Sequence, residues 1–147
     1  MIRRVLNVLG AASVIAAAAA SLAAQAPVAT SGAWVREPVP GRPTTAAYLV
    51  IENPGSDDIQ IVSATSSAAG NVEMHEMVRE GDVMKMAPVK SITVPANGRV
   101  ELKPGGLHIM LFNLKQPLKE GDVVPITLST NRGWTVRVQA PVKKGGM

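Results

Sequence analysis

Both histidines of this 147-residue chain and five of its seven methionines lie between residues 74 and 110. Residues two apart in a β-strand point to the same face, so each short cluster in this region offers one same-face pair of donors. The pairs are His75 with Met77, Met84 with Met86, and His108 with Met110. If strand pairing brings these faces together, imidazole nitrogens and thioether sulfurs would share one site.

Imidazole and thioether donors together favour a soft metal ion. Neutral sulfur binds Zn²⁺, Mg²⁺ and Ca²⁺ poorly and suits Cu(I), whereas Cu(II) would be held more weakly. The chain has no cysteine, which excludes disulfides, thiolate zinc and iron–sulfur sites and the blue-copper centre. A set of two histidines and two methionines therefore predicts a Cu(I) site.

A turn near residues 80–82 could pair the first two of these clusters in a hairpin. If residues 80 and 81 form a two-residue loop, Met77 lies opposite Met84 and His75 lies opposite Met86. A three-residue loop with a bulge would instead shift the pairing by one residue. The first register places one imidazole and three thioethers on one face.

The alternation around His108 predicts where its side chain points. Leu107, Ile109 and Leu111 form an apolar stripe that suits a hydrophobic core. His108 and Met110 must then face the other way, where packing does not readily explain a methionine.

These patterns predict one metal site with ligands from three strands. Its ligands are His75, Met86, His108 and Met110. Met74 should face away from His75 and lie in the core. Because methionine often fills gaps in cores, Met77 and Met84, taken singly, are better explained by packing than by metal binding.

Strand-like segments alternate with turn signals rich in Gly, Pro and Asn after residue 30, and no helix-length period occurs there. This pattern predicts an all-β fold, either an antiparallel β-sandwich or a Greek-key barrel. Residues 69–71 are expected to form a turn, and residues 143–147 a frayed end. The expected strands are Thr44–Glu52, Ile59–Thr65, Val72–Val78, Val83–Met86, Ser91–Val94, Arg99–Leu102, Leu107–Leu111, Val123–Ser129 and Trp134–Val138.

The N-terminus predicts export. Residues 1–24 contain two arginines, an Ala-rich apolar run and small residues suited to cleavage, which is typical of a signal peptide cut between residues 23 and 26. A membrane anchor or a buried Ala-rich helix is the alternative. Residues 25–147 are then a single domain without a membrane span. Its dispersed charges and few aromatic residues predict no nucleic-acid binding.

The donor spacing resembles that of the PCuAC family of periplasmic copper chaperones. The family pattern is His, ten residues, Met, twenty-one residues, His, one residue and Met, and His75, Met86, His108 and Met110 match every interval. The resemblance covers about residues 33 to 130. Segments that also resemble the family are Ala33–Arg36, Pro43–Tyr48, Glu52–Ser56, Gly81–Met86 and Leu114–Asp122.

Membership would imply a cupredoxin-like β-sandwich in the periplasm that binds Cu(I) through these four side chains at one exposed site. It would also imply delivery of copper to the copper-bearing subunit of cytochrome c oxidase, directly or through a thiol-containing chaperone. Some relatives carry a His- and Met-rich tail with a second, Cu(II) site. Here the tail after Ala140 has only Met147 and no His, so we expect no such second site.

Two other interpretations remain open at this point. A copper buffer or resistance protein could use the same site without specific delivery. A metal-free sandwich could use the methionines as a contact patch for adhesion or assembly. Enzyme activity is not expected, because the chain lacks a nucleophile elbow, paired-carboxylate motif or His-rich zinc motif. We expect a monomer.

Overall fold

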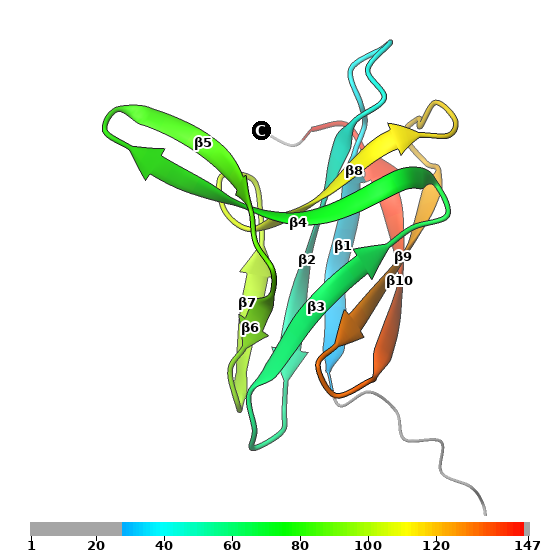
Figure 1. Cartoon of the computed structure of the whole chain (residues 1–147). Helices are drawn as coiled ribbons and strands as arrows, with labels where there is room; N and C mark the ends of the chain where they lie inside the picture. The colour runs from blue at the N-terminus through cyan, green and yellow to red at the C-terminus, as the bar shows by residue number, and fades with distance from the viewer. Residues whose placement is uncertain (1–27, 146–147) are drawn as a thin grey trace, which may run out of the picture.

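The computed structural model describes residues 28–145, which form only strands and connecting loops (Figure 1). The predicted signal peptide, its cleavage region and Met147 lie outside the described residues. No helix capable of crossing a membrane occurs between residues 28 and 145. The strands are β1 (Ala29–Arg36), β2 (Thr45–Asn53), β3 (Ile59–Thr65), β4 (Ala69–Glu80), β5 (Val83–Pro88), β6 (Ile92–Val94), β7 (Gly98–Leu102), β8 (His108–Leu114), β9 (Val123–Thr130) and β10 (Thr135–Lys143).

The strands form a sandwich of two connected sheets. One sheet runs in the order β5-β4-β8-β2-β1, and the other runs β10-β9-β3-β6. In the first sheet, β2 pairs with β8 through its first residues and with β7 through its last residues. A pairing of β1 with β10 joins them, and it is parallel, whereas the other pairs are antiparallel. The predicted all-β sandwich is confirmed. The parallel pair departs from a purely antiparallel fold. It joins the first and last described strands, and a parallel pair of this kind needs a long connection and not a short hairpin.

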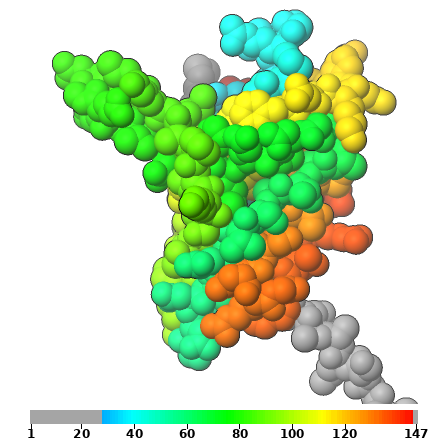
Figure 2. Space-filling model, viewed as in Figure 1, coloured from blue at the N-terminus to red at the C-terminus, as the bar shows by residue number. Residues whose placement is uncertain are grey.

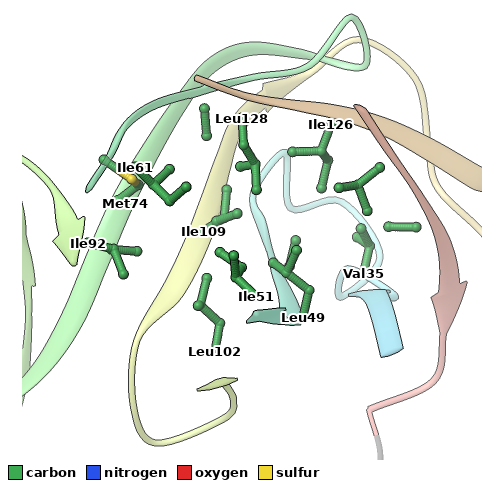
Figure 3. Close-up of a cluster of buried hydrophobic side chains, with 14 of the residues drawn as sticks. Val35, Leu49, Ile51, Ile61, Met74, Ile92, Leu102, Ile109, Ile126 and Leu128 are labelled. Atoms are coloured by element: carbon green, nitrogen blue, oxygen red, sulfur yellow. The ribbon is translucent and has the colours of Figure 1, made fainter. Parts of the chain in front are cut away.

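Alternating side chains of both sheets fill the core (Figure 3). In β9, Val124, Ile126 and Leu128 are buried and alternate with more exposed neighbours, as a strand with one inward face requires. Ile109 is almost fully buried in the same core, and Met74 packs there as predicted. Residues adjacent to these two on β4 and β8 must therefore point to the opposite face of their sheet.

Two segments differ from the sequence-based expectation. The structure has a strand, β1, where none was predicted. Its alternation is irregular, because Gly32 has a φ of 60° and the pairing with β2 shifts between Ser31 and Trp34, so the sequence pattern did not reveal it. The turn predicted at residues 69–71 is wrong, since these residues begin β4. Gly70 is needed there for a close approach, because an added Cβ would lie 3.0 Å from the Asn113 Cβ.

Lys143 was predicted to begin a frayed end, but it is the last residue of β10. The last residues of β10 pair with β1, where Val35 is the partner of Val142 and Arg36 is the partner of Lys143.

The outer part of β4 forms a hairpin with β5 that projects from the sandwich (Figures 1 and 2). β5 is the last strand in its sheet and pairs only with β4 among the described strands. Its side chains therefore lack a second neighbouring strand, and Val83, Met84 and Met86 are exposed.

Candidate metal centre

The two histidines face each other on neighbouring strands. His75 of β4 is the direct partner of His108 of β8, and their ring centroids are 5.8 Å apart. Both are buried, although they lie on the face of the sheet opposite the core residues Met74 and Ile109. The strand register therefore brings together two imidazoles that are 33 residues apart in the chain.

Each imidazole has one nitrogen held by a hydrogen bond and one left free. His108 Nδ1 lies 2.8 Å from the Gly106 carbonyl oxygen, and it must donate because that oxygen can only accept. His75 Nε2 lies 2.8 Å from Glu73 Oε2 and donates to this carboxylate when the ring is neutral. Neutral rings in these tautomers present lone pairs at His75 Nδ1 and His108 Nε2. Both atoms are buried and have no hydrogen-bond partner.

Glu73 sets the orientation of His75. The hydrogen bond from His75, and a further one from Asn71, hold the pKa of Glu73 below its usual range. An ionised carboxylate on the remote nitrogen of an imidazole is the usual support of a metal-ligating histidine, because it fixes the tautomer and makes the other nitrogen more basic.

Thioether sulfurs accompany the imidazoles on the same face. Met110 follows His108 by two residues and is only 8% exposed, whereas Met86 on β5 is 54% exposed. A pocket of about 370 Å³ is lined by both of these methionines, His108, Met77 and neighbouring residues. His75 does not line this pocket, but its ring centroid lies 5.8 Å from that of His108, which does. The four predicted ligands thus lie in one region, three of them buried and one exposed.

The predicted pairing within the hairpin is wrong. Met77 lies opposite Met86, and His75 lies opposite Pro88. The loop consists of residues 81 and 82, because Gly81 has a φ of 60° and a glycine at the first loop position suits a type II′ turn. This register differs by two residues from the expected one, so each side chain keeps its predicted face.

Aromatic side chains lie beside both imidazoles on the sheet. The His108 ring lies 6.5 Å from Tyr48, which lies 4.7 Å from Trp34, and the His75 ring lies 5.9 Å from Phe112. Burial raises the pKa of Tyr48, although nearby Arg36 lowers it in part, so the phenol stays neutral beside His108. These rings restrict both imidazoles from the side.

Sequence reasoning missed Glu73, the Gly106 carbonyl and the aromatic row. Glu73 precedes His75 by two residues, and Phe112 follows His108 by four, so strand alternation places both on the imidazole face. That signal could have found them. The carbonyl oxygen of Gly106 carries no side-chain signal, and only the conformation of the loop brings it to His108.

The donors beside the imidazole pair are mainly sulfur atoms. Between residues 28 and 145, no three His, Cys, Asp or Glu side chains are grouped so that they could hold a metal ion. Two neutral nitrogens with thioethers nearby form a donor set for a soft, singly charged cation.

The LpqE-like family, described as "Putative lipoprotein LpqE-like", matches residues 28–142. This chain belongs to the LpqE-like, or PCuAC, family. The resemblance seen in the donor spacing is therefore confirmed. The fold of this PCuAC chain is the cupredoxin-like β-sandwich that membership implies.

Two known proteins are similar to this PCuAC chain in sequence. "Putative lipoprotein Lxx21020" of Leifsonia xyli subsp. xyli is 41% identical over 117 residues, which cover 79% of the chain and 69% of that relative. "Uncharacterized protein RP573" of Rickettsia prowazekii is 33% identical over 84 residues, which cover 56% of the chain and 46% of that protein.

Solved structures share the fold. The solution structure of CuI-DR1885 from Deinococcus radiodurans is 36% identical, with a TM-score of 0.67 and coverage of 84% of this PCuAC chain and 83% of that protein. The copper-bound PCuAC domain from PmoF2 has a TM-score of 0.71 at 21% identity, covering 83% of this chain and 97% of that domain. Because the PmoF2 domain is only 21% identical to this chain, its similarity concerns the fold alone.

Proposed function

We propose that this chain is an exported copper chaperone that binds Cu(I) through His75 Nδ1, His108 Nε2 and the sulfurs of Met86 and Met110. The observation that carries the proposal is the pair of buried, unpartnered imidazole nitrogens beside a methionine-lined pocket. A buried polar atom without a partner costs about 1 to 3 kcal/mol. A bound cation would use both lone pairs and offset that cost.

The donor set favours the cuprous ion. All four donors are neutral, two are soft sulfurs, and a thioether holds Cu(I) more loosely than a thiolate does. This suits a carrier, which must bind its metal and release it to a receiving protein. The solution structure of CuI-DR1885, a relative at 36% identity, is that of a Cu(I) form, and this supports the same choice of metal here.

In this proposal, the chain delivers copper in the periplasm to the copper-bearing subunit of cytochrome c oxidase, directly or through a thiol-containing chaperone. The delivery role rests on family membership and on the exposed Met86, which an acceptor could reach without unfolding the sandwich. A copper buffer or resistance protein is the alternative, because it could use the same site without an acceptor.

The binding site is tested by anaerobic Cu(I) competition titration together with X-ray absorption. We expect one tightly bound Cu(I) with two nitrogen and two sulfur ligands. The double variant M86L/M110L should lose most of the affinity, whereas M84L, an exposed methionine on the same hairpin, should keep it. Retained affinity in the double variant would favour a contact patch and contradict the proposed ligands.

Delivery is tested by mixing the copper-loaded protein with the soluble copper-binding domain of the oxidase. Transfer should fill the acceptor faster than free Cu(I) buffered at the same activity. An acceptor that fills no faster would identify a buffer.

A further inference from the structure

The β4–β5 hairpin carries more sulfur than the proposed site uses. Met77 and Met86 are direct partners in the ladder, and Met84 lies on the same face of β5, two residues nearer the turn. Side chains of direct partners start from Cβ atoms about 5 Å apart, so two flexible thioethers can bind the same ion. Met86 and Met84 are exposed and Met77 is half-buried, so packing does not account for this arrangement.

The two faces of the hairpin differ in chemistry. The other face carries the ion pair between Lys85 Nζ and Glu80 Oε2, which are 2.8 Å apart. On the sulfur face the charged residue is Arg79, and its Nε donates to the Gly81 carbonyl oxygen at the turn, 3.2 Å away. The surface between the turn and the imidazoles is therefore occupied by thioethers.

Met77 lies between this exposed surface and the buried nitrogens. It follows His75 by two residues on the same face of β4, and it lines the same pocket as Met86, His108 and Met110. A copper ion held by Met86 could therefore contact Met77 on its outer side and the imidazoles on its inner side.

We propose that Met77 and Met86 form an outer Cu(I) position through which copper enters and leaves the imidazole site. This inference rests on the proposed function. In the outward step, the bonds from copper to the two imidazole nitrogens and to the Met110 sulfur break in turn as a bond to the Met77 sulfur forms, while Met86 stays bound. All of these donors are neutral and copper remains Cu(I), so no electron or proton moves. An acceptor then takes the ion from the half-buried Met77 and the exposed Met86.

The experiment measures the rates of Cu(I) loading and release separately from the equilibrium affinity for Cu(I). The protein and its M77L variant are loaded anaerobically with one equivalent of Cu(I), and transfer to excess bicinchoninate is followed by stopped-flow absorbance. Loading from a weak Cu(I) complex is measured in the reverse direction. M84L is the matched control on the same face, and M77I replaces M77L if the latter changes the thermal unfolding of the metal-free protein.

Removing a ligand that binds copper only in passing lowers the rates of loading and release by the same factor and leaves the equilibrium affinity unchanged. We expect M77L to slow loading and release by about tenfold each, equivalent to about 1.4 kcal/mol of barrier, with an unaltered Cu(I) affinity. M84L should keep the rates of the unaltered protein. Unchanged rates in M77L would overturn the inference, and so would a loss of affinity, since Met77 would then be a permanent ligand. Failure of the unaltered protein to bind Cu(I) would instead refute the proposed function.

Discussion

The β4–β8 face and the β4–β5 hairpin contribute to the same candidate site in different ways. On the β4–β8 face, His75, His108 and Met110 are buried, and each imidazole is held by a hydrogen bond. On the hairpin, Met86 is exposed and β5 has a single neighbouring strand. Preorganised donors favour tight binding, and exposed donors permit exchange. We infer that affinity comes from the first region and access from the second.

Loss of a buried nitrogen should have the largest effect. We expect H108A to lower Cu(I) affinity at least about 100-fold, because it removes a preorganised ligand that no nearby side chain replaces. Anaerobic competition titration measures this loss. The metal-free variant should remain folded, since the ring lies outside the core cluster. A loss no greater than that of M86L would contradict the division between the two regions.

Low pH should weaken Cu(I) binding by the two imidazoles but not by the thioethers. Imidazoles compete with protons for copper and thioethers do not, so affinity should fall about tenfold or more between pH 7.5 and pH 5. Glu73 stays ionised over this range, because its hydrogen bonds hold its pKa below its usual value. Equal affinity at the two pH values in a Cu(I) titration would show that the imidazoles are not ligands.

The two proposed sulfur ligands should differ from each other. M110L removes a buried donor beside His108, whereas M86L removes an exposed one that Met77 can partly replace. We expect about a tenfold loss of affinity in M110L and a smaller loss in M86L. X-ray absorption on Cu(I)-loaded M86L should still count two sulfur ligands. A count of one would show that Met77 cannot substitute.

Removing the support of His75 should have a moderate effect. E73A leaves the ring without its carboxylate partner, and such partners change metal affinity by about tenfold or more. E76A is the matched control, because Glu76 lies on the opposite face of the same strand. In E73Q the amide oxygen can still accept the hydrogen bond, so this variant should retain more affinity than E73A. Equal affinities in E73A and E76A would contradict the role of Glu73.

A substitution in the turn of the β4–β5 hairpin should have the smallest effect of these changes on the stability of the sandwich. G81A places a side chain at a φ of 60°, which costs about 1 to 2 kcal/mol locally. Because the hairpin projects from the body, the thermal midpoint of the metal-free protein should change little. Hydrogen exchange of β5 amides should nevertheless accelerate. A large fall in the midpoint would show that the hairpin is not an independent arm.

Regular strands could be predicted from local pattern, and irregular ones could not. β9 begins at the predicted Val123 and extends one residue beyond the predicted Ser129, because its buried side chains alternate along its whole length. β1 was missed because a positive φ at Gly32 and a shift in pairing obscure its alternation. Gly70 was misread as a turn, since its need for close contact with Asn113 is visible only once both strands are paired.

Local alternation is enough to predict which side chains share a face, because a strand alternates its side chains regardless of its partner. Met74 in the core and His75 on the other face of β4 follow from that rule alone. Which residues lie opposite each other depends on how the strands pair in the folded protein. The loop conformation set Met77 against Met86, and pairing of distant strands set His75 against His108. Alternation is a local property of the backbone, whereas register depends on the turn and on burial across the whole sheet.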